Sequence, residues 1–206
     1  MPKQTFFNLP REKSDHIMHA AIAAFSERGY HDTSITCIVD RAGIAKGSFY
    51  QYFEDKDDLY LHILHMIAKR KLDVFKREFA GSPTITLTQF MRKTAHLQLL
   101  EFKEVPELTK IGMELARNMH EPIAKKFIES INNTADSLYI GFIENEKLQG
   151  RLDRNVDSRM LNYMLTSIAN YIIERIEGGN GEIESAFVDE VYDKLEYILT
   201  NGIYGG

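Results

Sequence analysis

Apolar residues recur along this chain at the three- and four-residue steps of amphipathic α-helices. Ile17, Ala21, Ala24 and Phe25 follow this spacing and predict a first helix over residues 10–28. No stretch of the sequence shows the sustained alternation of apolar and polar residues that indicates a half-buried β-strand. The pattern therefore predicts an all-α fold.

Glycine and proline mark where the predicted helices end. Gly29 follows the first helix, Gly43 separates two short helices, and prolines interrupt the chain further on. The other helices are expected over about residues 34–41, 45–52, 55–79, 86–103, 107–118, 121–146, 157–177 and 183–201. The long helix after residue 55 would join an amino-terminal domain, residues 1–56, to a larger helical domain, residues 57–206.

The two short helices around Gly43 have the form of a helix-turn-helix. Ile38 and Phe49 can close a small core beneath them, and no acidic residue lies between Arg41 and Phe53. An acid-free face of cations, hydroxyls and amides suits a DNA major groove, because phosphates attract cations and base edges bond short polar groups. Small helical domains that do not bind DNA also carry such faces, and the spacing alone leaves both interpretations open.

Composition and charge are compatible with a DNA-binding protein. The chain has 206 residues, of which 44% are apolar and 27% charged, as in globular proteins. Its net charge of −5 is uneven: residues 1–56 hold seven basic and seven acidic residues, so the remainder carries the deficit. The sequence contains no apolar run of 18 residues and no secretory signal, and we expect a cytoplasmic location.

Enzyme and metal chemistry have no support in the sequence. Cys37 is the one cysteine, so no internal disulfide can form. The histidine pairs His16/His19 and His62/His65 lack a third ligand at a matching spacing, and zinc needs at least three. No phosphate-binding loop, dinucleotide fingerprint or nucleophile elbow occurs. We therefore expect neither an enzyme nor a cofactor.

The run from Gly29 to Leu59 resembles the signature of the TetR family of bacterial repressors. The pattern G-[YF]-x-x-[TA]-[ST], then I-x-x-x-A-G-[VI]-x-x-G-x-[FL]-Y-x-[YH]-F, then K-x-x-L is met at nearly every fixed position. The resemblance covers about residues 10–60 and the general helical plan of the rest. It implies a homodimeric repressor that binds palindromic operator DNA and is released by a small-molecule effector.

The resemblance also implies which residues contact DNA. Thr33 and Ser34 would meet phosphates, Gln51 would read a base, and Lys56 would hold a phosphate. The full expected set is Thr33, Ser34, Lys46, Gly47, Ser48, Tyr50, Gln51, Tyr52 and Lys56.

The helices of the larger domain are rich in methionine and aromatic residues. The resemblance makes them a candidate pocket for an apolar or amphipathic effector, although residues of these types at helical spacing more often form an ordinary core. The candidate set is Phe102, Met113, Arg117, Phe127, Tyr139, Phe142, Met164 and Tyr171.

The last two predicted helices each carry an apolar stripe. From spacing alone, an internal core is the simpler interpretation, but the resemblance favours a four-helix dimer interface. Its expected residues are Leu161, Leu165, Ile168, Ile172, Phe187, Val191, Leu195 and Ile198. A second function class stays open: a helical small-molecule sensor or scaffold whose helix-turn-helix does not bind DNA.

Overall fold

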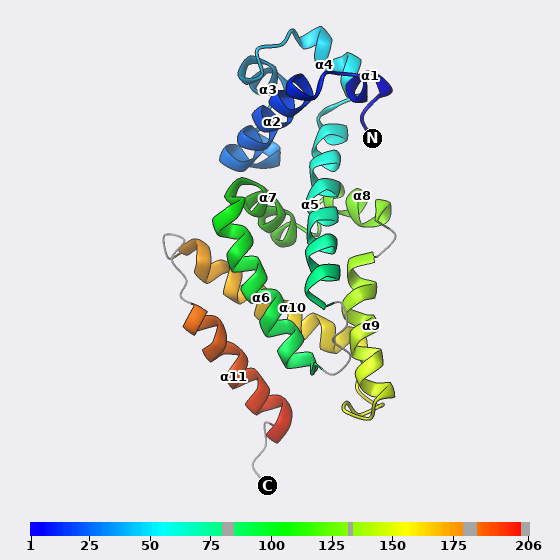
Figure 1. The fold of residues 1–206 in the computed structure, drawn as a ribbon, viewed down its shortest axis with the longest axis vertical. Helices are drawn as coiled ribbons and strands as arrows, with labels where there is room; N and C mark the ends of the chain where they lie inside the picture. The colour runs from blue at the N-terminus through cyan, green and yellow to red at the C-terminus, as the bar shows by residue number, and fades with distance from the viewer. Residues whose placement is uncertain (80–84, 132–133, 179–184, 203–206) are drawn as a thin grey trace. The chain divides into compact units, whose positions relative to one another are not determined.

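The structure is a computed structural model that describes residues 1–79, 85–131, 134–178 and 185–202 (Figure 1). Within these residues it contains α-helices and no strand, which confirms the all-α prediction. The helices are α1 (Gln4–Phe7), α2 (Arg11–Asp32), α3 (Ile35–Arg41), α4 (Lys46–Tyr52), α5 (Lys56–Phe79), α6 (Leu87–Glu104), α7 (Pro106–Arg117), α8 (Pro122–Ser130), α9 (Thr134–Leu148), α10 (Ser158–Gly178) and α11 (Ser185–Asn201).

Two helix predictions were wrong. The short helix α1 was not predicted, because four residues are too few to show a period. The single helix expected over residues 121–146 is two helices, α8 and α9. Positions 132 and 133, which lie outside the described residues, are both asparagine, a weak helix former.

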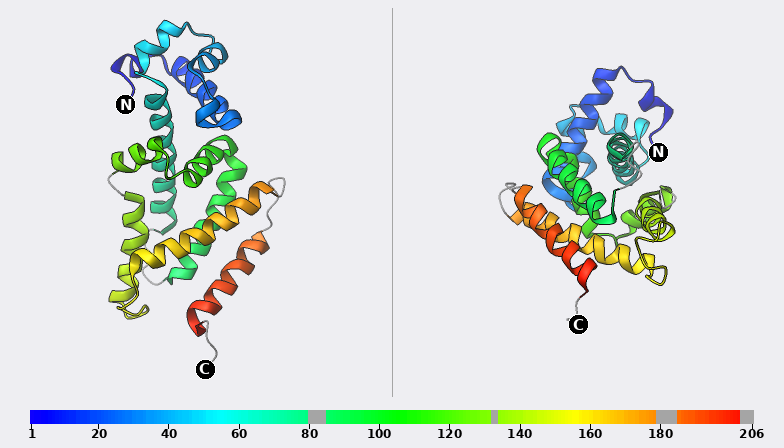
Figure 2. Two further views of the ribbon diagram at one scale, coloured as in Figure 1. Left: turned by 180° about the vertical axis from the view of Figure 1, so that it is seen from behind. Right: turned by 60° about the horizontal axis from the view of Figure 1, so that its bottom comes forward.

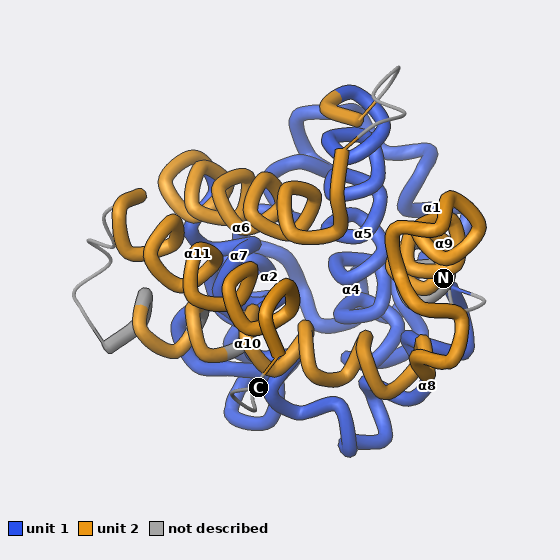
Figure 3. Tube along the Cα trace, turned by 90° about the horizontal axis from the view of Figure 1, so that it is seen from below, with its two compact units in different colours: residues 1–77, 105–132 blue, residues 78–104, 133–206 orange. Residues whose placement is uncertain are grey.

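The chain forms two compact units, each built from two separate stretches of sequence (Figure 3). Unit 1 comprises residues 1–77 and 105–132, and unit 2 comprises residues 78–104 and 133–206. This division does not follow the expected boundary at residue 56, because unit 1 also includes α7, α8 and nearly all of α5.

Unit 1 is built around the first half of α5. Leu59 and Ile63 on this helix are fully buried, together with Phe25 of α2 and Phe49 of α4. Helix α2 packs against α3 and α7, and α4 packs against α1 and α3. The turn between α3 and α4 contains Gly43 at a φ of 60°, a conformation that glycine adopts without steric cost. The predicted helix-turn-helix is therefore present.

Unit 2 is a helical body in which α6 packs against α9 and α11, and α9 packs against α10 (Figures 1 and 2). Phe90 of α6 lies at its centre, fully buried and stacked on Phe142 of α9 with 4.4 Å between the ring centroids. Val188 and Tyr192 of α11 are also buried. Over the part of the chain that the structure describes, no helix is long and apolar enough to cross a membrane.

The apolar stripe expected at a dimer interface is largely internal to one chain. Leu161, Leu165 and Ile172 of α10 and Leu195 of α11 are buried within the single chain. Their place in a subunit interface stays a prediction, and within the single chain these side chains contribute to the core of unit 2. The other members of the expected set are less buried: Ile168, Phe187 and Val191 are half-buried and Ile198 is exposed.

A second apolar face on α10 points to solvent in the single chain. Met160, Tyr163, Met164 and Tyr171 are exposed, with Tyr163 at 71%. They follow one another at steps of three, one and seven residues, so they share one side of the helix. Both sides of α10 are thus apolar, and sequence periodicity alone could not tell the inner side from the outer one.

Candidate nucleic-acid interface

Helix α4 is held by its buried face and by the turn before it. Phe49 and the following Phe53 are completely buried in the core of unit 1. At the start of α3, the hydroxyl of Ser34 accepts a hydrogen bond from the amide of Cys37 at 3.1 Å. Ser34 is the N-cap residue of the helix, so its hydroxyl satisfies an amide that has no partner within α3. The two helices of the motif are therefore fixed by local capping and by shared core residues.

The outer face of α4 carries the side chains expected to read DNA. Lys46, Gly47, Tyr50 and Gln51 are exposed, and Ser48 is half-buried. Their spacing places the exposed four on one side of the helix. A Cβ atom built on Gly47 would meet nothing within 4 Å, so the backbone at this point is open to close approach. The face thus presents a cation, a phenolic hydroxyl and an amide, which are groups that can bond phosphates and base edges.

Two expected phosphate contacts are buried instead. Thr33 is 1% exposed, and its hydroxyl donates to the carbonyl oxygens of Gly29 at 2.6 Å and Ala24 at 3.1 Å. Tyr52 is 6% exposed, and its ring packs 6.2 Å from that of Phe6. In the structure the Thr33 hydroxyl closes the end of α2, and the phosphate contact expected of Thr33 stays a prediction. The Tyr52 ring is part of the core.

Lys56 stands at the start of α5 and is engaged within the protein. Its ammonium donates to the carbonyl oxygen of Tyr30 at 2.7 Å and lies 4.3 Å from the centre of the Tyr30 ring. This cation therefore joins the beginning of α5 to the end of α2. Any contact that Lys56 makes with a phosphate would be added to this structural role.

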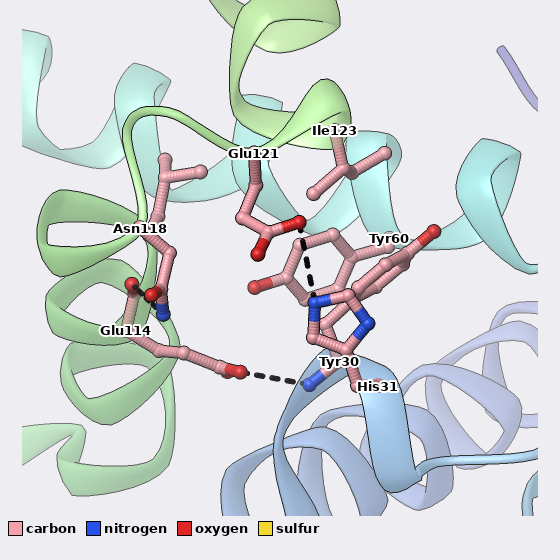
Figure 4. Close-up of a pocket in the computed structure, with 8 residues that line it drawn as sticks. Tyr30, His31, Tyr60, Glu114, Asn118, Glu121 and Ile123 are labelled. Carbon is pink, nitrogen blue, oxygen red and sulfur yellow. Dashed lines mark hydrogen bonds and ion pairs between the residues drawn. The ribbon is translucent and has the colours of Figure 1, made fainter.

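Tyr30 is the centre of a polar junction that the sequence did not reveal (Figure 4). Its amide donates to Glu114 Oε1 of α7 at 2.9 Å, and its hydroxyl donates to the carboxylate of Asp57. Asp57 also accepts from the ammonium of Lys126 at 2.6 Å. Glu114 is 84 positions from Tyr30 in the sequence, so no local pattern could have paired them.

Protonation equilibria at the junction follow from these contacts. Burial and the hydrogen bond to the Asp57 carboxylate raise the pKa of the Tyr30 hydroxyl, which stays a donor. Burial of Asp57 opposes its ionisation, but the hydrogen bonds from Lys126 and Tyr30 outweigh this effect and lower the pKa of Asp57. The Asp57 carboxylate is therefore ionised and accepts both bonds at neutral pH.

A small pocket opens beside the junction (Figure 4). Tyr60, Glu114 and Asn118 line it, together with His31 and Glu121, whose Nε2 and Oε2 atoms lie 3.4 Å apart. The pocket has room for about one water molecule. It is therefore too small to be the effector site.

The residues expected to line an effector pocket belong to both compact units. Tyr139 and Phe142 meet Phe90 within unit 2, with centroid distances of 5.6 and 4.4 Å. Phe127 belongs to the core of unit 1, where its ring lies 5.5 Å from that of His65.

The other expected effector residues lie in varied surroundings. Phe102 is half-buried, Met113 is buried and Arg117 is exposed. Met164 and Tyr171 are 52% and 48% exposed in the single chain, and their place in an effector pocket stays a prediction. Among the residues that the structure describes, no group of three potential ligands could hold a metal ion.

The amino-terminal part of the chain matches a known family model. Residues 17–63 match the model of the bacterial regulatory proteins of the tetR family. This range contains α3, the turn, α4 and the start of α5, which are the elements that present the outer face of α4.

Proteins of known sequence or structure resemble the chain over most of its length. An uncharacterized HTH-type transcriptional regulator, YvdT, from Bacillus subtilis is 28% identical over 182 residues, which cover 72% of this chain and 91% of that protein. A TetR family transcriptional regulator from Chloroflexus aurantiacus is 28% identical, with a TM-score of 0.64 over 98% of this chain and 90% of its own. The transcriptional regulator FadR from Bacillus subtilis, crystallised with stearoyl-CoA, shares the fold at 17% identity, with a TM-score of 0.72 over 92% and 99% of the two chains.

Proposed function

The chain belongs to the TetR family of bacterial transcriptional regulators, and from this premise we propose that it is a homodimeric repressor released by a small molecule. It would bind a palindromic operator with one α4 helix in each of two successive major grooves. The observation that carries this proposal is the outer face of α4, where Lys46, Tyr50 and Gln51 are exposed around the open backbone of Gly47.

The residues of this face would have different roles, because phosphates and base edges of DNA bond different groups. Lys46 and the Tyr50 hydroxyl suit phosphates, which fix the register of the helix but carry no sequence information. The Gln51 amide can form two hydrogen bonds with an adenine edge. Ser34 is exposed at the start of α3 and supports a further phosphate contact. Lys56 would reach a phosphate while it remains bonded to the Tyr30 carbonyl.

Dimerisation is proposed through the outer face of α10 together with Ile198 of α11. A palindrome requires two recognition helices about 34 Å apart, which one chain cannot supply. Met160, Tyr163, Met164 and Tyr171 expose a contiguous run of apolar side chains, and such runs on regulators mark subunit interfaces. Pairing two copies by a two-fold axis would cover this face on both.

We propose an amphipathic effector with a long acyl chain. FadR from Bacillus subtilis has this fold and was crystallised with stearoyl-CoA. The aromatic group around Phe90 in unit 2, with Phe79, Tyr139 and Phe142, supports a ligand with an apolar part. An effector acts only through its different affinity for two states of the protein, and the packing of α2 on α7 offers the contact that those states would change.

The proposed operator binding is tested by using the full chain to select duplexes from a random-sequence library. The proposal expects enrichment of a palindrome whose half-sites are about one DNA turn apart. Absence of any enriched sequence would favour the alternative, a helical sensor whose helix-turn-helix does not bind DNA.

The test of the effector half uses the selected duplex. Stearoyl-CoA should weaken binding by about 5- to 150-fold, which is the usual range of coupling between two sites. Coenzyme A without an acyl chain is the control and should leave binding unchanged. Equal affinity with and without stearoyl-CoA would refute the acyl class and leave the repressor proposal standing.

A further inference from the structure

The carboxyl-terminal end of the recognition helix leaves backbone carbonyl groups that the helix itself cannot satisfy. In α4 the carbonyl of Phe49 accepts the amide of Phe53 at 2.8 Å. The carbonyls of Tyr50, Gln51 and Tyr52 follow it and have no donor within the helix. Two of these three residues, Tyr50 and Gln51, also carry side chains on the exposed face.

The first residues of the chain supply a donor to each of these three carbonyls. The Lys3 ammonium donates to the Tyr50 carbonyl at 2.8 Å, and the Lys3 amide donates to the Tyr52 carbonyl at 2.8 Å. The Thr5 hydroxyl donates to the Gln51 carbonyl. Helix ends are usually closed by a glycine or by water, whereas here a segment more than 40 positions away in sequence closes the end.

A buried aromatic side chain fastens the same segment. Phe6 is 4% exposed, and its ring lies 4.8 Å from that of Phe53, the residue directly after α4. It also meets the edge of His62 on α5 at 6.1 Å. Helix α1 is therefore packed between the end of α4 and α5, and its position beside α4 is visible in Figure 1.

We propose that residues 3–7 are a positioning element for the recognition helix, through which operator discrimination depends on Lys3 and Thr5. These residues fix the direction of the last turn of α4 by holding its three terminal carbonyls. The side chains of Tyr50 and Gln51 project from that turn. Their orientation relative to the major groove therefore depends on the direction of the turn. The inference rests on the proposed function, because it concerns how the DNA-reading face is held.

The variants Lys3→Met and Thr5→Val each remove one side-chain donor while keeping the length or shape of the side chain. Each should weaken binding to the duplex selected by the wild-type chain by about 2- to 10-fold, the usual effect of one hydrogen bond. Binding to a scrambled duplex should stay unchanged. Thr5→Ser keeps the hydroxyl and should bind as the wild type does. Lys125→Met, at an exposed lysine of α8, is the control for the lost charge.

Two further readouts separate positioning from a direct phosphate contact. If Lys3 acts through the Tyr50 carbonyl, the dependence of log affinity on log salt keeps its slope in Lys3→Met. The loss of one phosphate contact in each of the two subunits would instead lower the slope by about 1.8. Without DNA, hydrogen exchange of the amides at residues 50–53 should be faster in the double variant Lys3→Met/Thr5→Val than in the wild type.

Each possible result either supports or rejects the positioning role of residues 3–7. Unchanged exchange at residues 50–53, unchanged operator affinity, or a lower salt slope in Lys3→Met overturns the positioning role. If the wild-type chain selects no duplex, the proposed function fails instead. In that case unchanged exchange still rejects the closure of α4 by residues 3–7, and faster exchange retains it as a structural contact without a role in DNA reading.

Discussion

The backbone amide of Tyr30, just after the last regular turn of α2, donates a hydrogen bond to the side chain of Glu114 on α7 across 2.9 Å. This bond joins the helix that precedes the helix-turn-helix to a helix more than 70 residues further along the chain. Both helices belong to unit 1, so this bond is a direct link between α7 and the helix that leads into the helix-turn-helix.

The first prediction concerns this bond. Glu114→Leu leaves the partly buried Tyr30 amide without its acceptor and should destabilise unit 1 by about 1–3 kcal/mol. Glu114→Gln retains an oxygen acceptor and should destabilise unit 1 clearly less than Glu114→Leu does. Hydrogen exchange of residues 29–33, followed by mass spectrometry beside urea unfolding, measures both effects. Equal behaviour of the leucine and glutamine variants would show that the hydrogen bond does not hold the junction.

A second prediction compares two glycines with positive φ. Gly29 has φ 76° and ψ 172°, a region that is essentially restricted to glycine, and a Cβ there would lie 2.7 Å from Glu114 Oε1. Gly43 has φ 60° and nothing within 4 Å of a Cβ. Gly43→Ala should therefore cost only backbone strain, about 1–2 kcal/mol. Gly29→Ala should cost more, and thermal melting of the two variants should rank them in this order; the reverse order would contradict the close approach of Glu114.

A third prediction separates the two apolar sides of α10. Tyr163→Glu places a charge on the exposed side and should give a folded monomer in sedimentation velocity experiments. Leu165→Glu buries a charge in the core of unit 2 and should unfold the protein. A wild-type chain that stays monomeric at every concentration, or a Tyr163→Glu variant that dimerises normally, would exclude this interface.

Contacts between residues close in sequence could be predicted for this chain, and contacts between distant residues could not. The helix-turn-helix could be predicted, because its turn, capping residue and core all lie within about 25 consecutive residues. Glu114 lies 84 positions from Tyr30, and Tyr50 lies 47 positions from Lys3. A single hydrogen bond between such distant residues produces no periodic pattern in the sequence, so it could not be predicted. On α10, Leu165 and Met164 belong to two apolar stripes with the same helical spacing, so the period identifies the helix but not its buried side.

A fourth prediction concerns pH. Burial lowers the pKa of the His62 and His65 imidazoles below their usual value, while the nearby Asp58 carboxylate opposes the shift at His62. The unfolded chain therefore binds more protons than the folded one near pH 6, and stability should fall as the pH drops below about 6.5.

The matched variants for the pH effect are two histidine replacements. His62→Phe keeps a ring against Phe6 and cannot be protonated, so its melting temperature should fall less between pH 7.5 and 5.5 than that of the wild type. His16→Phe, at an exposed position of α2, is the control and should retain the wild-type dependence. Identical pH profiles of the His62→Phe variant and the wild type would contradict the assignment.

The variant Gly47→Leu tests whether the outer face of α4 reads DNA. A leucine at this position meets no atom of the protein within 4 Å of its Cβ but would stand between the helix and the groove. The measurement is titration of the selected duplex beside thermal melting of the same sample. We expect a melting temperature close to that of the wild type and loss of specific binding. Wild-type affinity in the folded Gly47→Leu variant would show that α4 is not the recognition helix.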